Sequence, residues 1–317
     1  MVKSGESLIL SVCIVNWNTN FRLQKCLEMV YSNIGIEDFE VFIVDNNSSD
    51  DSLTRIPKNL RNLRIICNSD NRGFSKANNQ MLRLAKGKYA LLLNPDAYIL
   101  PDAIPSLITF MERHPNVGAC GPKLLNLDLS FQRSFFEFPT LYNEVKSHLV
   151  YNFPPFSRYL RGLDTSQTII SMQKTISEPV GVDAIPGACF LVRRKTYEEV
   201  GLMEEDYFLY SEENDWCWRM MKDEWQVFYF PESQVIHEGG ESSKNSTKSV
   251  LTHSFYSSRY KFFKKHKRKY EYMILKMMNI FFFSWLLIIT TTMMILNKYD
   301  RKLITENINS HLRLLMF

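Results

Sequence analysis

Short aliphatic runs mark the first part of the chain. They cover Leu8–Val15, Glu40–Val44 and Tyr89–Leu93, and each is followed by Asn or Asp. Continuous runs of this length are typical of strands that are buried on both faces of a parallel sheet. Between them, Phe21–Tyr31 and Phe74–Leu84 carry apolar residues at helical spacing. The pattern therefore predicts strands that alternate with helices.

A helix from Pro101 to Arg113 and a strand from Val117 to Cys120 continue this order, because proline suits the first turn of a helix. We therefore expect an open α/β sheet with helices on both faces. Ligands bind such sheets at the carboxyl ends of the strands. Three polar clusters follow the predicted strands: Asn16-Trp17-Asn18, Asp45-Asn46-Asn47-Ser48-Ser49-Asp50 and Asn94-Pro95-Asp96.

The middle of the chain is less regular. Residues 126–178 show no sustained period, and we interpret them as a variable loop region. Regular patterns return with the apolar segment 182–194. Two helices, at 195–200 and 211–222, and a strand at 226–230 are predicted after it.

The C-terminal part changes character. Seven cations between Arg259 and Lys269 precede twenty uncharged residues, Met277–Leu296. Twenty such residues are enough to cross a bilayer, and the cations would face the cytoplasm and anionic lipid. Asn279, Ser284 and three threonines dilute the segment, so a helix lying on the membrane is an alternative. A soluble core helix is a third interpretation.

Composition narrows the function classes. The net charge of +4 gives no support for nucleic-acid binding. Six scattered cysteines without a C-x-x-C pair indicate reduced thiols and a cytosolic face. The polar N-terminus lacks the pattern of a signal peptide, so export is not expected. Without a Gly-rich dinucleotide fingerprint or a P-loop, dehydrogenases and P-loop NTPases lose support.

Two strand-end carboxylates are candidates for nucleotide chemistry. Asp96 follows three leucines and is a suitable ligand for Mg²⁺ or Mn²⁺ on a diphosphate. The same Asn-Pro-Asp could instead be a turn before the next helix. Asp45 could accept the ring N–H of a pyrimidine, or it could simply form a turn. Gly73 permits a close backbone approach, which would let Arg72 pair with phosphate.

The later acids and a histidine are also ambiguous. Ser211 followed by Glu212, Glu213 and Asp215 is a good helix start, because serine caps and acids favour the first turn. One of these carboxylates could alternatively act as a general base for an acceptor hydroxyl. His237 could complete a metal site, or it could be a structural histidine.

Taken in order, these clusters resemble the inverting glycosyltransferases of family 2 and, within them, the rhamnosyltransferase-like branch. The resemblance covers about Leu8 to Lys269. Its motifs are Ser11-Val12-Cys13-Ile14-Val15-Asn16-Trp17-Asn18, Val44 to Asp50, Asn71-Arg72-Gly73-Phe74, Asn94-Pro95-Asp96, Pro186-Gly187-Ala188, Glu212-Glu213-Asn214-Asp215, and His237 with Gly239-Gly240.

The resemblance implies an α/β fold of the GT-A type. This fold has a Rossmann-like nucleotide-binding domain with a mostly parallel central sheet, here followed by C-terminal membrane-associated helices. The domain would cover residues 1–258, with a basic and hydrophobic helical segment at 259–317. Its parts would be a nucleotide-binding half (1–125), the variable loop region (126–178) and an acceptor or catalytic half (179–258).

The resemblance also assigns roles. Asp96 would hold Mg²⁺ or Mn²⁺, with His237 as a second metal contact. Glu213 would be the base, with Glu212 and Asp215 as alternatives. Pro186-Gly187-Ala188 and the aromatics around Trp216 and Trp218 would face the acceptor. The nucleotide side would include Asn16, Asn18, Asp45 for the base, Asn47, Arg72, Gly73 and Asn94.

The implied function is inverting transfer of a sugar from a nucleoside-diphosphate sugar, with L-rhamnose from dTDP-rhamnose as first choice. The acceptor would be a lipid-diphosphate-linked saccharide in surface polysaccharide synthesis, on the cytoplasmic side of the plasma membrane. One alternative is a catalytically inactive, membrane-bound carbohydrate-binding protein. Another is a sugar-nucleotide nucleotidyltransferase, although Asn16-Trp17-Asn18-Thr19 lacks its expected Gly-rich loop.

Overall fold

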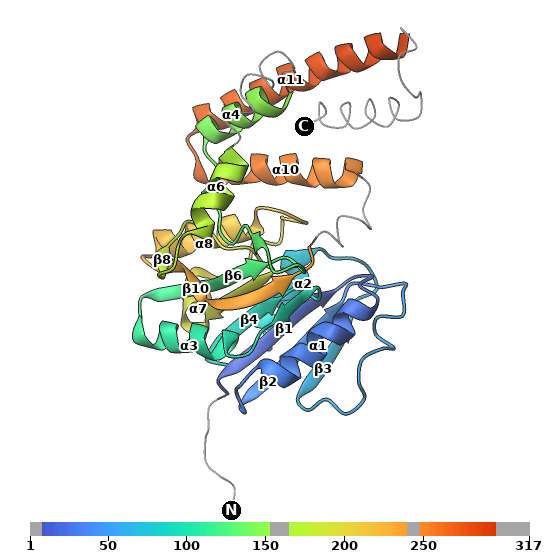
Figure 1. The fold of residues 1–317 in the computed structure, drawn as a ribbon. Coiled ribbons are helices and arrows are strands. Elements are labelled where there is room, and N and C mark those ends of the chain that lie inside the picture. The colour runs from blue at the N-terminus through green and yellow to red at the C-terminus, as the bar shows by residue number, and fades with distance from the viewer. Residues whose placement is uncertain (1–7, 153–164, 240–247, 296–317) are drawn as a thin grey trace, which may run out of the picture. The chain divides into compact units, whose positions relative to one another are not determined.

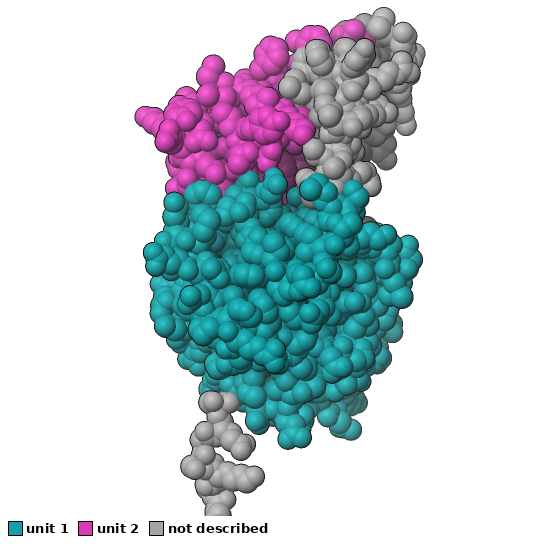
Figure 2. All heavy atoms as spheres, turned by 60° about the vertical axis from the view of Figure 1, so that its left-hand side comes forward, with its two compact units in different colours: residues 1–138, 169–208, 212–245 teal, residues 139–168, 209–211, 246–317 magenta. Residues whose placement is uncertain are grey.

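The computed structural model describes residues 8–152, 165–239 and 248–295. The chain forms two compact units, which Figure 2 colours teal and magenta. Unit 1 comprises residues 1–138, 169–208 and 212–245, and unit 2 comprises residues 139–168, 209–211 and 246–317. All candidate site residues named above belong to unit 1.

Four parallel strands form one half of the sheet in unit 1, in the order β3-β2-β1-β4 (Figure 1). Three of them are almost fully buried and confirm the strands expected from the aliphatic runs. The fourth, β3, lies at the sheet edge and is partly exposed, so its sequence carries no continuous apolar run. The bounds are β1 (Leu10–Asn16), β2 (Phe39–Asp45), β3 (Leu63–Cys67) and β4 (Tyr89–Leu93).

The sheet continues beyond β4 in the order β9-β6-β10-β5. Here β6 and β10 pair in parallel, whereas β9 pairs antiparallel with β4 and β6, and β5 with β10. The mixed α/β sheet agrees with the expected fold class, and β10 runs past the predicted end at Phe230 to His237. The bounds are β5 (Ala97–Ile99), β6 (Val117–Leu125), β7 (Phe131–Gln132), β8 (Val180–Gly181), β9 (Cys189–Arg193) and β10 (Gln226–His237).

The helices of unit 1 agree with their predicted positions to within a few residues. Helix α3 begins after Asp102, which has a left-handed φ of 60°, rather than at Pro101. In α1, the residues Leu23, Cys26, Leu27 and Val30 are buried and form the stripe expected from their spacing. The bounds are α1 (Phe21–Asn33), α2 (Phe74–Leu82), α3 (Ala103–Arg113), α7 (Arg194–Val200) and α8 (Glu212–Lys222).

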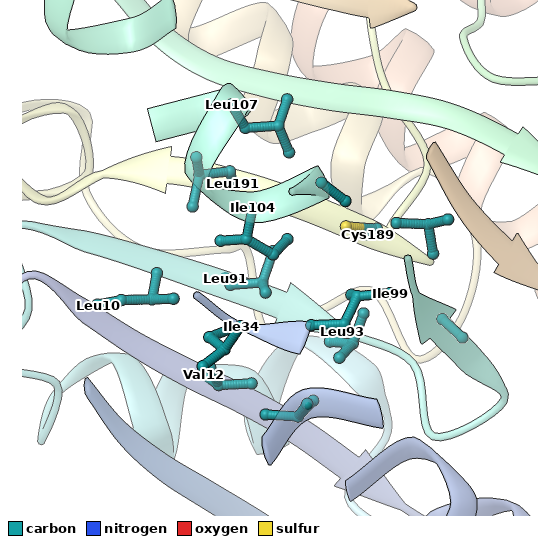
Figure 3. Packing of buried hydrophobic residues seen from close by; sticks show 14 of the residues in the cluster. Leu10, Val12, Ile34, Leu91, Leu93, Ile99, Ile104, Leu107, Cys189 and Leu191 are labelled. Carbon is teal, nitrogen blue, oxygen red and sulfur yellow. The ribbon is translucent and has the colours of Figure 1, made fainter. Parts of the chain in front are cut away.

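One hydrophobic core cluster lies on one face of the central strands (Figure 3). Leu91 of β4 and Leu191 of β9 are fully buried in it, and Ile104 and Leu107 of α3 belong to the same cluster. Fully burying an aliphatic side chain contributes about 1.5–3 kcal/mol to stability, so the buried side chains strongly stabilise these central strands. Their carboxyl ends can therefore hold side chains in fixed positions.

Unit 2 consists of helices in its described residues. Helix α11 packs against both α4 and α10. Helices α4 and α6 correct the interpretation of 126–178 as loop. Polar residues interrupt the apolar period of these helices, so the local sequence does not predict them. Helix α4 instead packs against the distant helix α11. The bounds are α4 (Leu141–Asn152), α6 (Thr165–Lys174, shared between the units), α10 (Lys248–His266) and α11 (Lys269–Ile295).

Candidate active site

Asp45 ends β2 and organises the first polar cluster. Its Oδ1 accepts hydrogen bonds from Asn16 Nδ2 at 2.7 Å and Ser48 Oγ at 2.6 Å. Its Oδ2 accepts one from the Ser48 backbone N–H at 3.0 Å. Asp45 is only 3% exposed. Oδ2 retains acceptor capacity for one further donor, which is what recognition of a pyrimidine N–H requires.

The loop after β2 is tied to the loop after β1. Asn16 lies beside Asp45 in register, and its Nδ2 also contacts Ser52 Oγ at 2.9 Å. Asn18 accepts the Ser49 N–H through its Oδ1 at 2.8 Å. Asn47 is exposed and has a left-handed φ of 62°. These contacts hold Asn16, Asn18 and Asp45 in one pair of adjoining loops.

Gly73 lies at a close backbone approach before α2. Its φ is 81°, and a Cβ there would meet the Phe208 carbonyl oxygen at 2.7 Å. The Gly73 carbonyl accepts a hydrogen bond from Asn46 Nδ2 at 3.3 Å, which connects this turn to the loop after β2. Arg72 is exposed, and its Nε lies 3.2 Å from Asp70 Oδ1. Because an exposed pair of this kind is weak, the guanidinium can turn toward an anion.

Asp96 and His237 meet where β4 and β10 end. His237 Nε2 lies 3.5 Å from Asp96 Oδ1 and 3.5 Å from Asn94 Nδ2. The Glu238 N–H donates to the Asp96 carbonyl at 3.0 Å, so the backbone also ties the two segments together. Asp96 is 6% exposed. The structure thus brings together the two residues that the sequence assigned to a metal.

Gln132 of β7 orients the ring of His237. Its Nε2 donates to Asn126 Oδ1 at 2.9 Å and to the His237 carbonyl at 3.2 Å. Its Oε1 therefore faces His237 Nδ1, at 2.7 Å. Since Oε1 can only accept, Nδ1 donates this hydrogen bond, and Nε2 is left facing Asp96. Such support of the second ring nitrogen is characteristic of metal-binding histidines.

The charge state of Asp96 suits a cation. Burial alone would raise the pKa of Asp96, but the hydrogen bond and charge of His237 lower it below its usual value. A carboxylate oxygen and an imidazole nitrogen at this distance favour a proton or a metal cation between them. Within the described ranges, no group of three or more His, Cys, Asp or Glu side chains is arranged around a single point. Any metal here would take its remaining ligands from elsewhere.

Glu213 stands at the start of α8 and faces the loop before β9. Its Oε1 accepts the Gly187 N–H at 3.0 Å. Burial raises the pKa of Glu213, although backbone hydrogen bonds, including that from Gly187, oppose the shift. The side chain is partly exposed. A partly exposed carboxylate with a raised pKa has the properties of a general base.

Glu212 and Asp215 have different surroundings from Glu213. Glu212 is 2% exposed, and burial followed by the charge of Glu213 raises its pKa well above the usual range. Asp215 is fully buried and accepts Arg219 Nε at 2.9 Å. Arg219 also donates to the Val200 and Leu202 carbonyls. The ion pair of Asp215 therefore joins α8 to the end of α7.

A short backbone path links Glu213 to Asp96. Glu213 binds the N–H of Gly187, and the carbonyl of the next residue, Ala188, accepts the Asn94 N–H at 3.0 Å. Asn94 is two residues from Asp96. On the other side, Asp45 ends β2 and Asn94 follows β4. Only β1 lies between these two strands in the sheet. The predicted residues therefore gather at the carboxyl ends of the parallel strands.

A model described as glycosyl transferase family 2 matches residues 11–201, which is more than half of the chain. The chain belongs to glycosyl transferase family 2. The matched range contains Asp45, Asp96 and Gly187 and ends before Glu213 and His237.

The chain is also similar to individual members of this kind. It is 27% identical over 254 residues to an N-acetylglucosaminyl-diphospho-decaprenol L-rhamnosyltransferase of Mycobacterium tuberculosis, covering 77% of this chain and 80% of that one. It is 24% identical over 236 residues to a dTDP-rhamnosyl transferase of Shigella flexneri, covering 73% and 69%. A solved mannosyltransferase from Pyrobaculum calidifontis, in complex with GDP-Man and Mn²⁺, superposes with a TM-score of 0.55. Its identity of 14%, over 96% of this chain and 84% of that one, shows the shared fold alone.

Some residues of the candidate site were not found from the sequence. Gln132 follows an irregular stretch, and nothing local marks it as a partner of a histidine 105 positions away. Glu238 accepts Arg22 Nε at 2.7 Å and the Tyr98 hydroxyl at 2.6 Å, which braces the segment after His237. One expectation was wrong: Trp216 cannot face an acceptor, because it is fully buried and stacked on Phe190.

Proposed function

We propose that this family 2 protein is an inverting glycosyltransferase that moves one sugar from a nucleoside-diphosphate donor to a saccharide carried on a lipid diphosphate. The observation that carries the proposal is the path Glu213–Gly187–Ala188–Asn94, which joins a candidate base to the Asp96–His237 pair. A base and a diphosphate site must lie on either side of a sugar C1 for this reaction. The other residues are assigned around that pair.

On the donor side, Asp45 would accept the ring N–H of a pyrimidine base through Oδ2. Asn16 and Ser48 already bind its Oδ1 and keep the carboxylate in place. Asn18, Asn47 and the turn at Gly73 would line the nucleotide. Arg72 is exposed and could pair with phosphate oxygens bidentately, as guanidinium groups do.

Asp96 and His237 would hold a divalent cation, with the amide of Asn94 beside them. Mg²⁺ or Mn²⁺ suits the carboxylate oxygen, with phosphate oxygens or water as further ligands, and the imidazole nitrogen favours Mn²⁺ of the two. When bound, such a cation supplies positive charge that stabilises the departing diphosphate. Gln132 fixes the ring of His237 so that Nε2 faces Asp96.

In the transfer step, an acceptor hydroxyl oxygen forms a bond to the sugar C1 as the bond from C1 to the donor diphosphate breaks. Attack comes from the face opposite the leaving group, so the configuration at C1 inverts. Glu213 takes the hydroxyl proton. The Gly187 N–H orients its carboxylate. Glu212 is a weaker candidate for the base than Glu213, because it is buried and its pKa is raised well above the usual range. Asp215 is disfavoured because it is held in an ion pair with Arg219.

The names of two relatives support a specific donor and acceptor. The Mycobacterium protein is named for L-rhamnosyl transfer to N-acetylglucosaminyl-diphospho-decaprenol, and the Shigella protein for dTDP-rhamnose. We therefore infer dTDP-rhamnose as donor and a polyprenyl-diphosphate saccharide as acceptor, in surface polysaccharide synthesis. We place the reaction on the cytoplasmic side of the plasma membrane, where the free cysteines of the chain would stay reduced.

The proposal is tested by Glu213→Gln. Binding of dTDP-, UDP- and GDP-sugars is measured with and without Mn²⁺, and transfer is measured to a polyprenyl-diphosphate-linked N-acetylglucosamine. We expect Glu213→Gln to abolish transfer while donor binding persists. In the native protein, transfer should rise with pH through the raised pKa of Glu213, because a base must be deprotonated.

The matched control is Glu198→Gln, the same change at an exposed glutamate on α7 that pairs with Arg194. It should leave transfer unchanged. Near-native transfer by Glu213→Gln would remove this residue from the role of base. Donor binding without transfer across the whole panel would favour the catalytically inactive carbohydrate-binding alternative.

A further inference from the structure

Helix α11 exposes one continuous apolar stripe. Its members are spaced by one, three or four residues, which places them on one side of the helix, and they are between 38% (Trp285) and 66% (Met277) exposed. The charged residues Glu271 and Lys276 fall on other faces of the helix. From the first member to the last, the stripe is about 27 Å long. The α11 stripe consists of Tyr270, Met273, Ile274, Met277, Ile280, Phe281, Trp285 and Ile288.

The opposite face of α11 is already covered by protein. Leu275 and Asn279 are fully buried, and Phe282 and Phe283 are at most 4% exposed. The ring of Phe283 lies 4.9 Å from that of Tyr256 on α10, and α4 packs on α11 as well. Among the described residues of α11, the stripe is therefore the face that exposes large apolar side chains.

Charged groups of the neighbouring helices lie level with the middle of α11. Tyr256 of α10 meets Phe283, and the Tyr260 ring lies 6.3 Å from that of Tyr272, so the two helices run antiparallel. Arg259 lies between those tyrosines in sequence and pairs with Glu144 of α4 at 3.3 Å. By length and composition, Lys269–Ile289 could cross a membrane. Crossing with this packing intact would draw Arg259 and Glu144 to the depth of the hydrocarbon, which is costly.

Cations gather where α10 ends and α11 begins. They would attract anionic headgroups, and the stretch from Lys261 to Leu275 contains a single acid, Glu271. Two stripe members, Tyr270 and Trp285, are of the kinds enriched at membrane–water interfaces. The combination of an apolar face with neighbouring cations is typical of helices that lie on anionic membranes. The exposed cations are Lys261, Lys264, Lys265, Arg268 and Lys269.

We propose that the α11 stripe lies in the plane of an anionic bilayer surface, with the cations of the α10–α11 junction on lipid headgroups, and that α11 does not cross the bilayer. The inference rests on the proposed function only for the presence of a lipid-linked acceptor. The contacts from which it is argued all lie within unit 2.

The first test measures binding of the full chain to vesicles of phosphatidylcholine with and without phosphatidylglycerol. We expect binding to the anionic vesicles to weaken as salt rises, because the headgroup attraction is screened. The double variant Met277→Glu/Phe281→Glu should lower the affinity by roughly tenfold or more, since charges replace the centre of the stripe. The matched control, Leu127→Glu/Leu129→Glu, changes two exposed leucines of unit 1 and should bind as the native chain does.

The second test distinguishes lying on the membrane from crossing it. Membranes from cells that make the full chain are washed with alkaline carbonate, which should release the protein; retention in the pellet would overturn the proposal. Native vesicle binding by the Met277/Phe281 variant, with an altered oligomeric state, would assign the stripe to a second copy and overturn it too. Donor binding, measured on the same samples, reports the proposed donor site separately from either result.

Discussion

Gly187 is the residue at which the candidate base meets the loop before β9. Its N–H binds Glu213, and its missing side chain leaves room for the carboxylate. A Cβ there would lie 2.6 Å from Glu213 Oε1 and 2.9 Å from Phe74 Cζ. Both contacts are shorter than van der Waals distance, so the glutamate would have to move.

We therefore predict that Gly187→Ala lowers transfer by roughly a hundredfold with little change in donor affinity, because a displacement of about 1 Å is enough to misalign a base. The control is Gly181→Ala, where the nearest atoms to a new Cβ are ring carbons of Phe228 at 3.9 Å. Steady-state kinetics of the two variants provide the measurement. Equal turnover in both would show that the approach of Gly187 does not position Glu213.

At the scale of elements, the start of α8 depends on an ion pair rather than on its capping sequence alone. Arg219 joins buried Asp215 to the carbonyls at the end of α7. Removing one partner of a buried pair leaves an uncompensated charge, which costs more than the pair itself contributes.

Arg219→Met should therefore lower the free energy of unfolding by about 3–5 kcal/mol. The double variant Arg219→Met/Asp215→Asn should recover part of that loss, since the buried carboxylate is gone. Arg194→Met removes an exposed pair with Glu198 and is expected to cost at most about 0.5 kcal/mol. Urea unfolding measures all three. A similar cost at Arg194 and Arg219 would contradict a structural role for the buried pair.

For the whole molecule, a donor in the proposed site would contact several loops of unit 1. A donor that occupies it would stabilise the folded chain by mass action, by about 2.7 kcal/mol when its concentration is a hundred times its dissociation constant. Ligand binding is therefore visible in thermal unfolding even when transfer is not measured.

We predict that dTDP-rhamnose raises the unfolding temperature, that Mn²⁺ increases the shift, and that EDTA abolishes this increase. Asp96→Asn should lose the Mn²⁺ increment, because a neutral amide is a poorer metal ligand. Asp128→Asn, at an exposed aspartate in the turn before β7, should keep it. An increment that survives Asp96→Asn would place the metal elsewhere.

The sequence by itself determined the central strands, most helices of unit 1, and the positions of the polar clusters. Aliphatic runs and helical spacing report local burial, and polar residues after buried strands necessarily lie at the edge where parallel strands end. This is why Asp45 and Asp96 could be chosen as candidates before any contact was known.

Only the tertiary structure decided how those candidates are held. The contact of Gln132 with His237, the pairing of Asp215 with Arg219, the burial of Trp216 and the helices of unit 2 all depend on partners from other elements. Sequence periodicity indicates which face of an element is apolar, but it does not predict which distant side chain packs against that face. The physical reason is that packing and hydrogen bonding act in space, between residues that the order of the chain leaves far apart.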